Sequence, residues 1–166
     1  MMNETKLEIL RLLEENGRLP IDTIAKLVQR DKEEVAKIIQ SLEDEKMILG
    51  YRAVVDWEKD QENTGVTAMI DVKVTPKRGV GFEQVAKRIY RFKEVDALYL
   101  MSGAYDLSVV VHGETMTEVA NFVSEKLSTL DDVVSTTTHF RLKTYKHDGV
   151  IFHDEDNEDK RMVVSP

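Results

Sequence analysis

The stretch VTAMIDVKV, residues 66–74, decides how the second half of the chain folds. Every second residue from Val66 to Val74 is apolar, and the residues between them are mostly polar. This period of two is typical of a strand with one buried face. The pattern leaves open which face Met69 takes, because Met69 is the apolar member of the otherwise polar set.

The segments that follow repeat one unit. Helical spacing of apolar residues covers about 82–89, strands are predicted at 95–101 and 107–112, a second helix covers about 116–130, and a last strand runs from about 133 to 145. Right-handed crossovers turn this order into a four-stranded antiparallel sheet with both helices on one face, the ferredoxin-like βαββαβ sandwich. The uncovered face of such a sheet predicts packing against a second copy.

The first fifty residues have the spacing of three helices. The first ends at Asn16-Gly17, where glycine suits a left-handed C′ position, and the second is short, over 21–28. The third opens at Asp31, which forms a capping-box pattern with Glu34, and a short strand is predicted at 51–55. The chain is therefore predicted to be α+β, with a helical domain at 1–56, a linker at 57–65, a sheet domain at 66–146 and an acidic tail at 147–166 in which 161–165 has strand composition.

Composition excludes several classes of protein. Apolar residues make up 42% of the chain, which is enough for a core, and the absence of cysteine excludes disulfide scaffolds and thiolate chemistry. The four histidines lack metal-ligand spacing, so neither a metal site nor a cofactor is expected. No apolar run reaches the length of a membrane span and no secretory signal is visible, so we expect a cytoplasmic protein.

The three helices resemble a helix-turn-helix, whose last helix enters the major groove of DNA. Lys32, Lys37, Gln40 and Ser41 of the third helix, Arg30 of the turn and Arg52 of the following strand are candidate contacts to phosphates or base edges. The alternative is a three-helix unit used for protein contacts. Five acidic residues in and just after the third helix and a net charge of -8 favour that alternative, since they repel phosphate.

The segment Gly103-Ala104-Tyr105-Asp106 lies between two strands of the sheet domain. Glycine permits an unusual turn, Tyr105 offers a ring and a hydroxyl, and Asp106 can accept a hydrogen bond from an ammonium group. The alternative is that Asp106 only accepts hydrogen bonds from amides of the turn.

Together these residues resemble the Lrp/AsnC family of transcriptional regulators. The resemblance is carried by residues 9–18 (ILRLLEENGR), by Ile24-Ala25, by residues 48–53 (ILGYRA) and by residues 103–107 (GAYDL). It implies a winged helix-turn-helix joined to a ferredoxin-like domain, dimers formed through the sheets, and assembly into tetramers or octamers. It also implies an amino acid or a related metabolite as effector, with Gly103, Tyr105 and Asp106 as site residues. In this hypothesis Asp106 binds an ammonium group and backbone amides bind a carboxylate.

Two departures from the family pattern concern the DNA-binding part. Ile38 stands where the family has arginine before Ile39, and Gln29 stands where a turn glycine is common. The sequence nevertheless predicts a regulator that binds double-stranded DNA and is not an enzyme. The alternatives are an enzyme similar to siroheme decarboxylases, which share the architecture, and a sensor that no longer binds DNA.

Overall fold

The computed structural model describes residues 4–62, 65–75 and 81–152. The chain divides into two compact units, Met1–Val55 and Asp56–Pro166.

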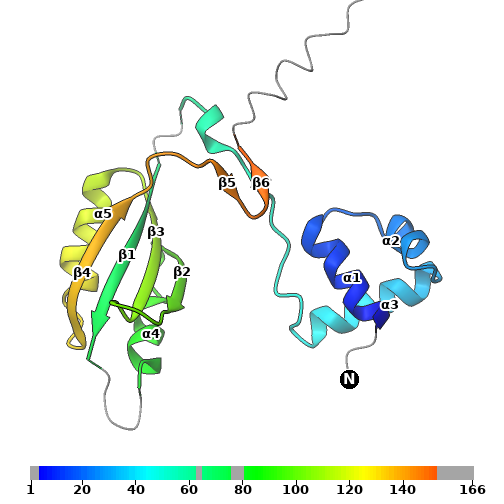
Figure 1. The fold of residues 1–166 in the computed structure, drawn as a ribbon, viewed down its shortest axis with the longest axis horizontal. Coiled ribbons are helices and arrows are strands. Elements are labelled where there is room, and N and C mark those ends of the chain that lie inside the picture. The colour runs from blue at the N-terminus through cyan, green and yellow to red at the C-terminus, as the bar shows by residue number, and fades with distance from the viewer. Residues whose placement is uncertain (1–3, 63–64, 76–80, 153–166) are drawn as a thin grey trace, which may run out of the picture. The chain divides into compact units, whose positions relative to one another are not determined.

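The first unit is built from three helices, α1 (Glu4–Glu15), α2 (Ile21–Leu27) and α3 (Lys32–Asp44), as predicted (Figure 1). Each helix places apolar side chains on one stripe, and the three stripes meet. The buried members of this core are Ile9, Ile24, Ala25, Val28, Val35 and Leu42. The core therefore holds α3 by one face and leaves its opposite face in solvent.

Two local expectations at the helix ends are wrong. Gly17 has no positive φ; what its position requires is space, because a Cβ there would lie 3.2 Å from Cδ1 of the Tyr51 ring. Asp31 is the N-cap of α3, as expected, but its side chain makes no capping hydrogen bond.

The predicted strand at residues 51–55 is also wrong, since the structure assigns no strand there. All five residues are exposed, and no other strand lies in this unit among the described residues. A strand is held by hydrogen bonds to a neighbouring strand. A segment with the composition of a strand therefore does not form one when it has no such neighbour.

The second unit contains the predicted four-stranded sheet. Its strands are β1 (Val66–Val74), β2 (Val95–Leu100), β3 (Leu107–Gly113) and β4 (Val133–Phe140), in the order β2-β3-β1-β4 with antiparallel neighbours. Helix α4 (Glu83–Ile89) links β1 to β2. Helix α5 (Met116–Phe122), continued by a π-helical turn at Val123–Leu127, links β3 to β4. This is the ferredoxin-like arrangement.

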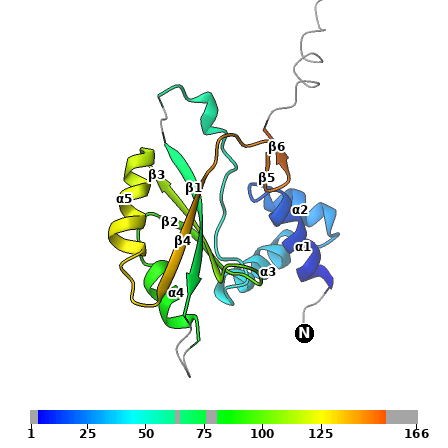
Figure 2. The ribbon, with the colours of Figure 1, turned by 60° about the vertical axis from the view of Figure 1, so that its left-hand side comes forward.

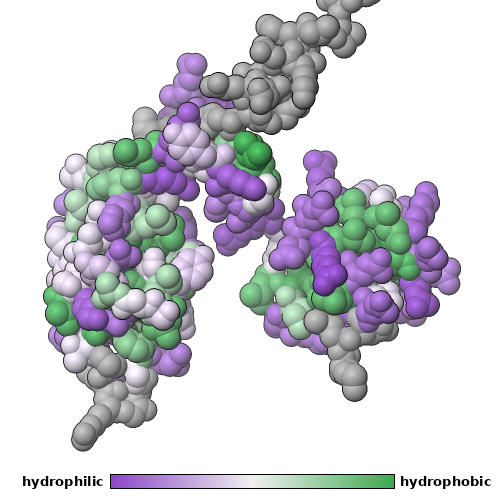
Figure 3. Space-filling view, in the orientation of Figure 1, coloured by the Kyte–Doolittle hydropathy of each residue, from purple (hydrophilic) through white to green (hydrophobic). Residues whose placement is uncertain are grey.

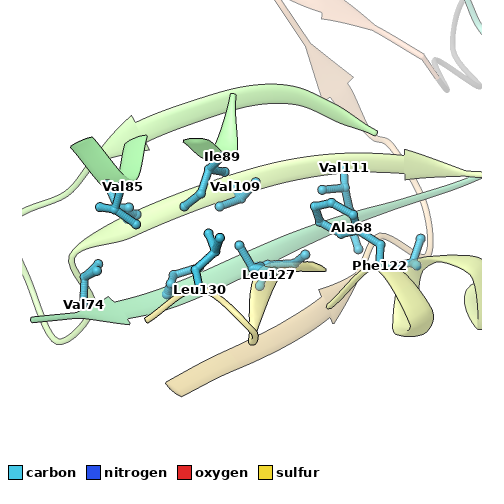
Figure 4. Packing of buried hydrophobic residues seen from close by; sticks show 13 residues of the cluster. Ala68, Val74, Val85, Ile89, Val109, Val111, Phe122, Leu127 and Leu130 are labelled. Carbon is cyan, nitrogen blue, oxygen red and sulfur yellow. The ribbon is translucent and has the colours of Figure 1, made fainter. Parts of the chain in front are cut away.

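Both helices lie on the same side of the sheet (Figures 1 and 2). Alternate residues of β1 and β3 point toward them and form the core with the apolar sides of α4 and α5 (Figure 4). Ala68, Ile70 and Val72 are fully buried, whereas Met69 is half exposed. The register that the sequence left open is thereby fixed, and Met69 lies on the uncovered face.

An ion pair supports the π-helical turn. Lys126, within the turn, approaches a carboxylate oxygen of Glu94 to 2.6 Å, and the Glu94 side chain is only 12% exposed. The other Glu94 oxygen is buried and has no hydrogen-bond partner among the described residues. Lys126 also lies over the Phe92 ring, which meets Phe122 edge-on at 5.5 Å. The hydrogen bond from Lys126 is thus the main side-chain contact that stabilises the Glu94 carboxylate among the described residues.

The ends of this unit differ in part from expectation. The segment predicted as linker contains one 3-10 turn, Trp57–Lys59, and β4 ends at Phe140 rather than near residue 145. A small hairpin follows, formed by β5 (Lys146–His147) and β6 (Val150–Ile151). Its connecting residues Asp148 and Gly149 both have positive φ, as a two-residue hairpin turn requires. The acidic run and the segment 161–165 lie outside the described residues.

Candidate DNA interface and effector turn

A tight turn joins α2 to α3. The Arg30 amide donates to the Ala25 carbonyl at 3.0 Å, and Gln29 takes φ of 52° to close the turn. A left-handed conformation suits glycine and costs other residues free energy. The left-handed backbone conformation explains why the family commonly has glycine at this position. Gln29 adopts this conformation with strain.

Helix α3 exposes three of the predicted contacts. Lys37 and Gln40 are exposed on the side opposite the buried Val35 and Leu42, and Lys32 is exposed at the start of the helix. Gln40 donates to Asp44 at 3.1 Å, one helical turn further on. The helix therefore presents two lysines and an amide to solvent, in the manner that a helix in the major groove requires.

Ser41 does not join this set. It is half-buried, and its hydroxyl donates to the Glu45 carboxylate at 2.5 Å and accepts from Lys6 of α1 at 3.4 Å. Arg52 is exposed in the segment after α3, without the strand that was expected to carry it.

A cleft of about 670 Å³ lies at the corner between α2 and α3. Its lining is Asp22, Ala25, Lys26, Gln29, Arg30, Asp31, Lys32 and Glu34. Lys32 is held there by Asp22 at 2.9 Å, and this hydrogen bond and the carboxylate's charge raise the pKa of Lys32. Lys26, which the sequence analysis missed, is exposed beside Arg30. The sequence feature that points to Lys26 is its position in the last helical turn of α2, just before the connection to α3.

Two of the acidic residues that argued against DNA are engaged within the unit. Glu45 pairs with Lys6 at 3.1 Å, and Glu43 accepts a hydrogen bond from the Tyr51 hydroxyl at 2.8 Å. Figure 3 shows hydrophilic and apolar side chains mixed over the visible face of this unit. The acids at the end of α3 are therefore partly neutralised by lysine or tied to tyrosine, whereas Glu33 and Glu34 remain exposed in its first turn.

The second site is the connection between β2 and β3. Asp106 holds this turn against β1 through its backbone amide, which donates to the Val72 carbonyl at 3.0 Å, and through its carboxylate, which accepts from the Val74 amide at 2.8 Å. Its backbone carbonyl accepts from the Met101 amide at 2.8 Å. Part of the role of Asp106 is thus to fix the shape of the turn.

The other two predicted effector residues lie in the same turn. The Tyr105 hydroxyl hydrogen-bonds to the Thr137 hydroxyl of β4 at 2.8 Å, so the tyrosine is directed across β1. Gly103 is exposed at the tip, with open space where a Cβ would stand. The structure therefore brings Gly103, Tyr105 and Asp106 together at one end of the sheet.

The uncovered sheet face beside this turn is mostly polar and partly apolar. His139 of β4 lies 3.1 Å from Asp71 of β1, and Arg141 donates to Thr67 at 2.9 Å. Met69 and Tyr99 add apolar area, each about half exposed. This face combines groups that a second copy could pair with.

The part of the chain that the structure describes holds neither a metal-binding cluster nor a membrane-spanning helix. There, no three histidine, aspartate or glutamate side chains converge as metal ligands. Over the same residues, none of the helices has both the length and the apolar character of a membrane span.

The three-helix unit and the ferredoxin-like unit are the architecture of a helix-turn-helix DNA-binding protein with a second, ligand-binding domain. Family models match both parts, the Winged helix-turn-helix DNA-binding model over residues 2–48 and the Lrp/AsnC ligand binding domain over residues 67–151. The chain belongs to the Lrp/AsnC family of transcriptional regulators.

Known relatives agree with this assignment. The chain is 61% identical over 165 residues, 99% of either chain, to the uncharacterized HTH-type transcriptional regulator YugG of Bacillus subtilis. It is 30% identical over 146 residues to the proline dehydrogenase transcriptional activator of Rhizobium radiobacter, covering 87% of this chain and 91% of that one. A transcriptional regulator from Neisseria meningitidis, solved in complex with L-Met, matches at 25% identity with a TM-score of 0.70, covering 89% and 94%.

Proposed function

We propose that this regulator binds DNA through α3 and responds to an amino acid or a related small metabolite by changing its oligomeric assembly. The observation that carries the DNA-binding part is the exposed side of α3, where Lys37 and Gln40 follow Arg30 and Lys32 of the α2–α3 corner. Arg52 adds a contact from the segment after α3, and Ser41 contributes only if its bond to Glu45 opens. Such a regulator acts where the chromosome lies, in the cytoplasm.

Dimer formation in this proposal uses the uncovered face of the sheet. Two-fold pairing would cover Met69 and Tyr99, and it would set two α3 helices against half-sites about one DNA turn, ~34 Å, apart. Tetramers or octamers of such dimers would raise avidity on one DNA segment through effective concentration.

The effector site in this proposal is the turn that holds Gly103, Tyr105 and Asp106. An effector that binds there between dimers shifts assembly only if it binds one arrangement more tightly than the other. The transcriptional regulator from Neisseria meningitidis that was solved in complex with L-Met supports an amino acid as ligand, since this chain matches it at 25% identity with a TM-score of 0.70.

The test is binding of the full chain to the DNA upstream of its own gene, measured by gel shift with and without pooled amino acids. Light scattering under the same conditions reports the assembly. We expect sequence-specific retardation, a shallow dependence on salt because few phosphates are neutralised, and a change of mass with the effective amino acid. Binding that is absent at low salt would contradict the DNA-binding part.

A sensor without DNA binding is the second candidate, and the acids Glu33 and Glu34 at the start of α3 favour it. It predicts an amino-acid-dependent change of mass with no retardation of any DNA. The same pair of measurements therefore separates the two candidates.

A further inference from the structure

The Asp106 carboxylate is already occupied on the side that faces the sheet. Its Oδ2 accepts from the Val74 amide at 2.8 Å and lies 3.6 Å from Nζ of Lys73, and the side chain is only 20% exposed. An effector ammonium brought to Asp106 would also approach the Lys73 ammonium, and like charges repel. The carboxylate is therefore a poor sole anchor for a cation.

Lys73 is the charged group at this turn that remains open to a ligand. Its side chain is 45% exposed, and its register partner in β4 is Ser135, on the uncovered face. Within the described residues, its ammonium contacts the Ala104 carbonyl at 3.3 Å and Asp106 at 3.6 Å. Both distances exceed the 2.7–2.9 Å of a strong charge-assisted hydrogen bond. A ligand oxygen could make a shorter bond with the remaining N–H of this ammonium.

Polar groups surround Lys73 on two sides. Its neighbour on the same face of β1, Asp71, is paired in register with Thr137, whose hydroxyl bonds to Tyr105. Further along the face, His139 bonds to the Asp71 carboxylate at 3.1 Å and Arg141 donates to Thr67 at 2.9 Å. The turn end of the face thus offers one loosely bound cation beside the Asp106 carboxylate and two hydroxyl groups, with the nearby Asp71 carboxylate already engaged by His139.

We propose that Lys73 binds the carboxylate of the effector and that Asp106 positions Lys73 rather than serving as the main ligand for an ammonium group. This inference rests on the proposed effector site at the same turn, and it names the ligand class as small carboxylates. It also makes Lys73 the residue that distinguishes an acid from its neutral analogue. In this proposal the effector carboxylate binds Lys73 rather than backbone amides of the turn.

The test is calorimetric binding of each common L-amino acid to the full chain, followed by the carboxamide of every amino acid that binds. A hydrogen bond to a charged group is worth about 1.5–3 kcal/mol, so the wild-type chain should prefer the acid by roughly 10- to 100-fold. In Lys73→Met this preference should collapse, while Lys73→Arg should keep part of it. Lys87→Met, at an exposed position of α4, is the matched control and should bind as the wild type does.

The outcomes distinguish a failure of the proposed role of Lys73 from a failure of the proposed amino-acid binding. If the wild type prefers the acid and Lys73→Met keeps the same preference, the role of Lys73 is overturned and the effector site stands. Equal wild-type affinity for acid and carboxamide also overturns it. If the wild type binds no amino acid, the proposed function fails at its effector step and this inference fails with it. Thermal unfolding of each variant confirms that the comparison is made between folded proteins.

Discussion

The hydroxyl of Tyr51 donates a hydrogen bond of 2.8 Å to the carboxylate of Glu43, joining the residue that follows Gly50 to the last turn of α3. The Tyr51 ring lies over Gly17, where a Cβ would be 3.2 Å from Cδ1. One side chain thus connects the end of α1 with the end of α3. Partial burial, and then the bond to Glu43, raises the pKa of Tyr51 to about 12.

Tyr51→Phe should lower the free energy of unfolding by about 1 kcal/mol, because it removes one hydrogen bond and leaves the ring in place. The pH dependence gives a second readout. The folded state keeps Tyr51 protonated above the unfolded value of 10.0, so its contribution is complete below pH 10 and is lost as pH rises toward 12. In denaturant melts, the difference between wild type and variant should shrink over that range. A difference that stays constant with pH would contradict the proton link.

Gln29→Gly should raise the free energy of unfolding by up to about 1 kcal/mol. Gln29 has φ of 52°, a conformation that costs a side-chain-bearing residue more than glycine. The matched control is Gln84→Gly in α4, an exposed helical position, where the same exchange should cost about 1 kcal/mol instead. Denaturant titration of both variants provides the comparison, and the same sign for both would refute the account of the turn.

Lys126→Met should destabilise the second unit by roughly 1–2 kcal/mol, because the mostly buried Glu94 loses its partner at 2.6 Å. The figure is reduced from that of a fully buried pair because Lys126 is 42% exposed. Adding Glu94→Gln should recover part of the loss, as the unpaired charge disappears.

The same pair sets an acid limit. The hydrogen bond that Lys126 donates lowers the pKa of Glu94 below its usual 4.5. The stability that this pair adds is therefore present above pH 4.5 and is lost as pH falls further. Thermal melts of wild type and Glu94→Gln should converge on acidification. Parallel curves would count against the pair.

Lys37→Ala should weaken DNA binding uniformly across sequences and lower the salt slope by about 0.9, the loss of one phosphate contact. Lys32→Ala should cost less, because Asp22 already neutralises Lys32 at 2.9 Å. Fluorescence anisotropy over a salt series measures both, with Lys87→Ala in the second unit as control. A larger loss for Lys32 than for Lys37 would reverse the assignment.

Met69→Lys should shift the protein toward monomer, since it places a charge at the centre of the uncovered face of β1. The matched control is Met116→Lys in α5, because the Met116 side chain is 51% exposed and the Met69 side chain is 50% exposed. Light scattering at several protein concentrations reads the result. An unchanged mass for Met69→Lys would contradict the proposed pairing through this face.

Much of the fold could be predicted because it depends on periodicity. Alternating apolar residues in β1 and three- and four-residue spacing in the helices are local properties, and the repeated order of elements restricts the topology to few choices. The strand at 51–55 failed for the same reason: local composition cannot supply the neighbour that a strand needs.

The sequence placed the candidate residues on elements of the fold, but it could not give their contacts. The sequence placed Lys37, Gln40, Tyr105 and Asp106 on the correct elements, yet it grouped Ser41 with the exposed residues, although Ser41 is turned toward Lys6 and Glu45. It also passed over Lys73, whose closeness to Ala104 joins residues 31 positions apart.

By itself the sequence determined the two units, their element order and the helix face that meets the core, because these follow from side-chain spacing along a single segment. Only the tertiary structure decided that Met69 faces outward, that Glu43 bonds to Tyr51 and that Asp106 holds the Val74 amide beside Lys73. The positions of Met69 and Asp106 depend on the register between strands distant in sequence, which the packing of the whole sheet sets, and the bond between Tyr51 and Glu43 depends on how the segment after α3 folds back onto that helix.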